Sequence, residues 1–170
     1  MKATSFRKDV LPLKDMLYRL ALRITVSREE AEDVVQDTLL KVWARRDSWQ
    51  EIDSIEAFSA AVCRNLALDR VKRKDAQNIP LSAMPGENAD AAYTPYESAS
   101  HSDKVEIVKR LIDSLPEKQR TCLQLRDIEG KSYKEVAAVM GVSEDVVKVS
   151  IFRARQTVKK KFQKIEDYGL

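Results

Sequence analysis

Apolar residues recur at three- and four-residue steps through the first third of the chain, which is the spacing of one helix face. The pattern predicts three amphipathic helices: one over 11–24, one that begins after Ser27, and one that begins near Asp53 or Ser54. Glu30 follows Ser27 by three residues, and Glu56 follows Asp53 likewise, which is the spacing of a capping box. The residues predicted to face inward are Leu13, Leu17, Leu20, Ile24, Ala31, Val34, Val35, Thr38, Leu39, Val42, Trp43, Ile55, Phe58, Val62 and Leu66.

A second helical block follows residue 104. Val105, Val108, Leu111, Ile112 and Leu115 form one apolar stripe, and Pro116 then favours the start of a new helix. The inward positions of that helix are Cys122, Leu123, Leu125 and Ile128, and Gly130 marks its end.

The last part of this block has the pattern of a helix-turn-helix. Ser132 begins a short helix, Gly141 suits the sharp turn, and Ser143 begins the final helix. The final helix is anchored by Val147, Ile151, Ala154, Val158 and Phe162. By elimination Lys148, Val149, Phe152 and Arg153 lie outward near its N-terminal half, where recognition residues reach base edges.

Charge divides the chain into three parts. The net charge of +3 comprises +3 for residues 1–74, −5 for 75–103 and +5 for 104–170. The middle part contains Pro80, Pro85, Gly86 and Pro95 and lacks helical periodicity. We therefore predict an all-α protein of two small helical domains, 1–74 and 104–170, joined by a flexible acidic linker. A solvated spacer without any specific role fits the linker equally well.

Basic residues are concentrated at the end of the third predicted helix. Arg64, Arg70, Lys72, Arg73 and Lys74 lie within three turns, a density that suits a phosphate backbone. The alternative is that these side chains only complement the helix dipole. Arg155, Lys159, Lys160, Lys161 and Lys164 add charge behind the outward face of the final helix.

Several classes of protein do not fit the composition. With one histidine, His101, and two distant cysteines, Cys63 and Cys122, we expect no zinc site, no disulfide framework, and no metal or other cofactor. No secretory signal or apolar run of about 18 residues is present, so the chain is expected to be soluble and cytoplasmic, without membrane insertion. No nucleophile has an evident base, which argues against an enzyme.

Three segments resemble the extracytoplasmic-function (ECF) sigma factors of bacterial RNA polymerase. AEDVVQDTLLKVW, from Ala31 to Trp43, is similar to the family's region-two helix, and AFSAAVCRNLALDRVKRK, from Ala57 to Lys74, resembles the promoter-melting helix that follows. LPEKQRTCLQLRDIEGKSYKEVAAVMGVSEDVVKVSIFRAR, from Leu115 to Arg155, resembles region four.

The resemblance implies a role for each basic or acidic surface. Asp33, Gln36, Asp37 and Lys41 would bind core RNA polymerase. A pocket for a flipped base of the minus-ten element would be formed by Trp49, Gln50, Glu51, Ile52 and Asp53, in the loop that ends at Ser54. Neighbouring DNA would be held by Arg64, Asn65, Arg70 and Arg73. The minus-thirty-five element would be read by Lys148, Val149, Phe152, Arg153 and Arg155.

The same resemblance implies core polymerase, promoter DNA and an anti-sigma factor as partners, and no catalysis of bond chemistry. The acidic linker would enter positively charged channels of the polymerase. Two departures from the family bear on promoter choice: Val146 and Val149 replace hydroxyl-bearing residues, and Phe58 stands where many relatives have tryptophan. A dimeric helix-turn-helix repressor or activator is the main alternative, and a small enzyme is a weaker one.

Overall fold

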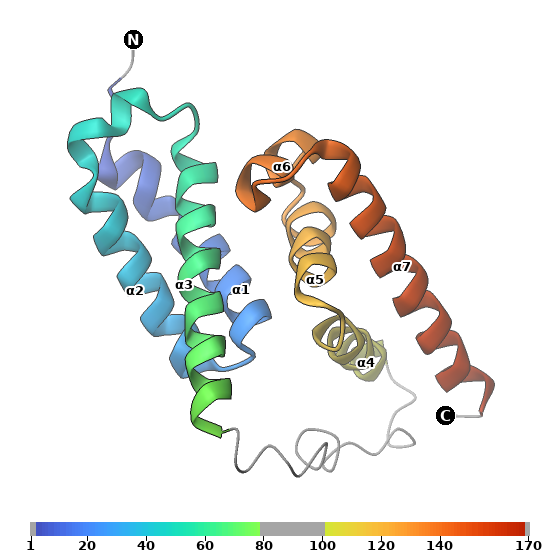
Figure 1. Ribbon diagram of the computed structural model, residues 1–170. Coiled ribbons are helices and arrows are strands. Elements are labelled where there is room, and N and C mark those ends of the chain that lie inside the picture. Colours follow the sequence, from blue (N-terminus) through green and yellow to red (C-terminus); the bar gives the residue numbers. More distant parts are fainter. Residues whose placement is uncertain (1–2, 79–100, 169–170) are drawn as a thin grey trace.

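The computed structural model describes residues 3–78 and 101–168, and all regular elements within these ranges are helical (Figure 1). The all-α prediction is confirmed. Of the predicted acidic linker, residues 79–100 lie outside the described ranges. Within the described ranges, no helix combines the length and the apolar run needed to cross a bilayer.

The first domain is built from three main helices. Short helical turns at Phe6–Val10 (η1) and Leu11–Leu13 (η2) precede α1 (Lys14–Thr25) and α2 (Arg28–Ala44). A 3-10 segment at Arg46–Glu51 (η3) then leads into α3 (Ile55–Asn78), which extends four residues beyond the predicted domain end at 74.

The second domain contains the predicted helix-turn-helix. Its elements are α4 (His101–Asp113), α5 (Glu117–Leu123), the turn η6 (Gln124–Ile128), α6 (Tyr133–Met140) and α7 (Glu144–Asp167). Gly141 joins α6 to α7 with φ 70°, a left-handed conformation that glycine adopts without a Cβ clash.

The predicted helix starts are confirmed by cap hydrogen bonds. The Ser27 hydroxyl accepts the Glu30 N–H at 3.3 Å, and the Ser132 hydroxyl accepts the Glu135 N–H at 3.1 Å. Ser143 caps α7 in the same way through the Val146 N–H at 3.3 Å. These hydroxyls satisfy first-turn donors that have no partner within the helix.

Small residues form the buried face of α3. Ser59, Ala60, Cys63 and Ala67 are buried, whereas the predicted inward residues Ile55, Phe58, Val62 and Leu66 are only half-buried. The prediction followed the large side chains, but the short ones allow α3 to pack closely against its neighbours. Phe58, Val62 and Leu66 instead line a groove beside α2.

The two tryptophans differ from their predicted exposure: Trp43 was expected in the core and Trp49 in an accessible loop. Trp43, predicted to be inward, is 45% exposed, and Trp49 is 7% exposed and packs with Val10 and Val42. Trp43 occupies the last turn of α2, where η3 folds back and brings the ring of Trp49 over the core instead. Two further inward predictions are wrong: Val105 and Ile128 are exposed, at the start of α4 and at the end of η6.

The two domains pack against each other along α3 and α1. α3 contacts α6, and α1 contacts α5 (Figure 1). The main group of buried apolar residues is therefore continuous, from Leu17 and Cys63 in the first domain to Cys122 and Val136 in the second. This contact was not predicted from the sequence.

Candidate nucleic-acid and partner interfaces

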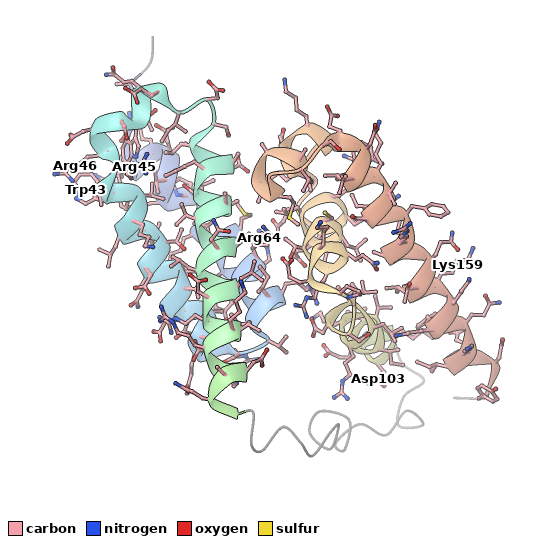
Figure 2. The ribbon with its side chains drawn as sticks, in the orientation of Figure 1. Trp43, Arg45, Arg46, Arg64, Asp103 and Lys159 are labelled. Carbon is pink, nitrogen blue, oxygen red and sulfur yellow. The ribbon has the colours of Figure 1, made fainter. Side chains whose placement is uncertain are left out.

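The acidic face predicted to bind a partner lies along the outer side of α2. Asp33, Gln36 and Lys41 are exposed and Asp37 is half-buried. Leu40 is 66% exposed in the same stretch, and Trp43 lies at the outer end of the helix (Figure 2). Neither Leu40 nor Trp43 was predicted to belong to this surface: Trp43 was expected in the core because of its apolar spacing, and Leu40 was assigned to no surface.

Arg70 of α3 faces this acidic surface. Its Nη1 lies 3.0 Å from Glu30 Oε2, and its Nη2 lies 3.1 Å from Asp37 Oδ2. Asp33 accepts a longer bond of 3.4 Å from the same guanidinium. The hydrogen bond to Glu30, then that to Asp37, raises the pKa of Arg70 against the effect of partial burial. A residue predicted to hold DNA thus lies between the residues predicted to bind polymerase.

Trp49 is an anchor of its loop. Its Nε1 donates to the Val42 carbonyl at 3.0 Å, and its ring stacks on Phe6 with a centroid distance of 6.5 Å. The predicted pocket residues that remain accessible are Gln50, Glu51 and Asp53, with Ile52 half-buried. The Trp49 ring is therefore not part of the open surface of the loop in this structure.

A groove of about 370 Å³ lies between α2 and α3, next to that loop. It brings together Lys41 and Asn65, which the sequence had assigned to different surfaces. The Arg45 guanidinium lies 5.7 Å from the ring centroid of Phe58 at the same place. The groove is lined by Lys41, Ala44, Arg45, Phe58, Val62, Asn65, Leu66 and Asp69. It presents two cations, an amide and the Asp69 carboxylate beside apolar side chains.

Arg64 lies on the side of α3 that faces the second domain (Figure 2). Its Nε and Nη2 donate to the two carboxylate oxygens of Glu117 at 2.9 and 3.0 Å. Burial acts to raise the pKa of Glu117, but the hydrogen bonds from Arg64 and Thr121 outweigh it and hold that pKa below its usual value. The pair therefore stabilises the folded molecule above the usual glutamate pKa and is lost as the pH falls through the lowered one. Arg73 is exposed further along α3.

The outward face of α7 is open as predicted. Lys148 and Arg153 are exposed, Val149 is 47% exposed and Phe152 is 62% exposed. A hollow of about 400 Å³ lies here, bounded by Tyr133 of α6 as well as by α7. Arg155 differs from the others, because its Nε donates to Asp127 at 2.9 Å, a bond that raises its pKa.

Family models match both domains of the chain. The model for sigma-70 region 2 matches residues 10–77, and that for sigma-70 region 4 matches residues 106–158. Among curated proteins, the chain is 30% identical over 145 residues to ECF RNA polymerase sigma factor SigF of Caulobacter vibrioides, and covers 77% of that protein and 85% of its own length.

Two other relatives agree with this match. ECF sigma factor EcfG of Rhodopseudomonas palustris is 28% identical over 159 residues, which span 89% of this chain and 81% of EcfG. SigE of Mycolicibacterium smegmatis is 31% identical over 150 residues, which span 85% of this chain but only 56% of SigE. The chain belongs to the ECF family of RNA polymerase sigma factors.

Solved structures show the same fold. The sigma factor RpoE, in complex with the anti-sigma factor NepR from Bartonella quintana, matches with a TM-score of 0.74 and 25% identity, over 94% of this chain and 96% of RpoE. CnrH, in complex with the cytosolic domain of CnrY, matches with a TM-score of 0.68 and 22% identity, over 94% of this chain and 88% of CnrH. The likeness to RpoE thus covers both domains.

The two tryptophans allow a test of the core assignment. Trp49→Ala should lower the free energy of unfolding by about 3 kcal/mol, because it removes a large buried ring. Trp43→Ala, the matched control, should cost about 1 kcal/mol or less, since that ring is half in solvent. Urea denaturation followed by circular dichroism measures both values. Equal losses for the two variants would contradict the assignment.

Proposed function

We propose that the chain binds core RNA polymerase and directs it to promoters through two separate DNA-binding surfaces, one on each domain. The observation that carries this proposal is the exposed outward face of α7 in the region-four domain, together with the acidic face of α2 in the region-two domain. The chain itself would catalyse no bond chemistry. We also propose a cytoplasmic location, because the chain would act on chromosomal DNA together with RNA polymerase.

The first domain would meet both polymerase and the minus-ten element. Asp33, Gln36, Asp37 and Lys41 of α2 form the proposed polymerase surface, with Leu40 as an apolar contact inside it. The loop Gln50–Asp53 and the groove beside Asn65 would take the unpaired strand, because stacking surfaces and cations together offset the cost of unstacking a base. Arg64, Arg70 and Arg73 would hold its phosphates.

The second domain would read duplex DNA in the major groove. Lys148, Val149, Phe152 and Arg153 lie exposed near the start of α7, the part of a recognition helix that reaches base edges. Val149 and Phe152 offer apolar contacts to thymine methyl groups, and Arg153 can form a bidentate pair with guanine. Arg155, held by Asp127, would contribute at the edge of this surface.

An anti-sigma factor is a further proposed partner. The solved structure of RpoE contains this sigma factor in complex with the anti-sigma factor NepR, and that of CnrH contains the cytosolic domain of CnrY. This chain has the same two-domain fold, so a protein of that kind has an equivalent surface to bind.

Run-off transcription with purified core polymerase and this chain tests the proposal directly. We expect RNA that starts at a restricted set of promoters in a genomic library and that is absent without the chain. Core polymerase and the chain should also co-elute in gel filtration. A chain that binds operator duplexes alone as a dimer, and does not co-elute with core, would instead be a helix-turn-helix repressor or activator.

Reversing one charge on α2 tests the polymerase surface. Asp33→Arg should weaken core binding at least about tenfold, because it places a like charge against a basic partner. Asp33 is suited to this test since it makes the longest of the three bonds to Arg70 and its side chain is 58% exposed. Asp15→Arg makes the same charge change at an exposed position of α1 and should have little effect. Equal binding by the wild type and Asp33→Arg would reject this surface.

Promoter choice tests the face of α7. Arg153→Ala should weaken minus-thirty-five recognition by about 1–3 kcal/mol and relax base preference at one position. Lys159 lies further along α7 than the predicted reading residues (Figure 2), so Lys159→Ala should weaken binding to all promoters alike. Transcription from a set of mutated promoters measures both effects. An unchanged base preference in Arg153→Ala would remove this residue from the reading surface.

A further inference from the structure

Within residues 3–78 and 101–168, ion pairs join the two domains at four places. Arg19 Nε lies 2.7 Å from Glu129 Oε2, and Arg23 Nη1 lies 2.7 Å from Asp113 Oδ1. Lys131 of the second domain pairs with Glu56 of the first, and Arg64 pairs with Glu117. Three of these pairs place an arginine of the first domain on a carboxylate of the second.

The Arg64–Glu117 pair is the one of these four that engages an arginine predicted to hold DNA. It is bidentate, and the Thr121 hydroxyl donates to the same Glu117 carboxylate at 2.8 Å, which fixes its orientation. The side chains are only 16% and 25% exposed, so water screens the pair less than it screens an open surface pair. A fork of two parallel N–H bonds is also the geometry in which arginine binds a phosphate.

The side-on fork of Arg64 cannot serve both partners at once. Of the five N–H donors of its guanidinium, the Glu117 oxygens occupy the parallel Nε–H and Nη2–H that form this fork. A DNA phosphate at the same fork would require Glu117 to leave, and Glu117 belongs to the first turn of α5 in the other domain. Access of DNA to this fork of Arg64 therefore requires movement of the second domain.

We propose that Glu117 stands in for a DNA phosphate on Arg64, so that the second domain and the unpaired promoter strand compete for the same guanidinium. The closed molecule is then self-inhibited at its minus-ten surface, and separation of the domains releases Arg64. This inference rests on the proposed function for the role of the strand, but the closure itself does not depend on it.

Two matched neutral variants test the competition on the full chain. Glu117→Gln removes the charge at the domain contact, and Glu166→Gln removes a charge that pairs with Lys104 inside the second domain. We expect Glu117→Gln to raise the radius of gyration in small-angle X-ray scattering. It should also bind a fluorescent single-stranded DNA oligonucleotide at low salt about fivefold more tightly than Glu166→Gln does. Circular dichroism checks that both variants keep their helical content.

A charge exchange separates closure from DNA binding. Arg64→Glu alone should open the molecule and bind the oligonucleotide more weakly than the wild type. The double variant Arg64→Glu, Glu117→Arg should return the radius of gyration to the wild-type value, because the pair is restored with its charges exchanged. The double variant should still bind the oligonucleotide weakly, because position 64 no longer carries a guanidinium that can bind a phosphate.

Each contrary result would reject a specific part of the proposal. An unchanged radius of gyration in Glu117→Gln would show that the pair does not hold the domains together. A larger radius without tighter oligonucleotide binding than in Glu166→Gln would reject the competition for Arg64, as would a lack of oligonucleotide binding in every variant. Failure of the wild-type chain to direct run-off transcription would reject the proposed function, while the radii would still report whether Glu117 closes the molecule.

Discussion

Close packing of α3 against three other helices is the constraint on which the rest of the structure depends. α3 contacts α1, α2 and α6, and its buried face consists of Ser59, Ala60, Cys63 and Ala67. Short side chains let neighbouring helices approach without voids. The Cys63 thiol lies deep in this contact, donates to the Leu17 carbonyl at 3.4 Å, and has its pKa raised to about 12 by burial.

The position of α3 decides where its arginines lie. Arg70 projects toward α2 and meets the acidic face there, whereas Arg64 projects toward the second domain and meets Glu117. In the second domain, Arg155 is held by Asp127 in a similar bidentate way. Three of the arginines predicted to bind DNA are therefore engaged by carboxylates in the molecule on its own. The pairs of Arg70 and Arg155 are the more exposed ones. Exposed pairs contribute about 0–1 kcal/mol, so a phosphate can replace those carboxylates at small cost.

Local features of the sequence predicted the local structure well. The caps at Ser27, Ser132 and Ser143, the turn at Gly141 and the outward face of α7 follow from rules that act within a few residues. The exchange of Trp43 and Trp49 could not be predicted in this way. Only Trp43 falls at the apolar spacing of a helix, and the fold of η3 onto Val10 buries Trp49 of the predicted loop instead.

Contacts between the domains could not be predicted from the spacing of residues along the chain, because they join residues that are far apart in the sequence. Arg64 and Glu117 are separated by 53 residues, and nothing in the spacing of charges along either helix links the two. The run of short residues at 59, 60, 63 and 67 was an available signal that α3 has a closely packed face. It does not identify the partner helix, because a small-residue face fits any neighbour that approaches it.

The two candidate DNA surfaces are unequally available in the closed molecule. The domain contact uses α5, η6 and α6 of the second domain, and it leaves the outward residues of α7 exposed. Duplex DNA can therefore reach Phe152 and Arg153 without any rearrangement, whereas a single strand can reach the fork of Arg64 only after Glu117 has moved away. Because any partner that binds only the separated domains must supply the free energy of separation, its binding and strand capture at Arg64 are thermodynamically coupled. On the proposed function, the fold would favour duplex recognition by the second domain before strand capture by the first.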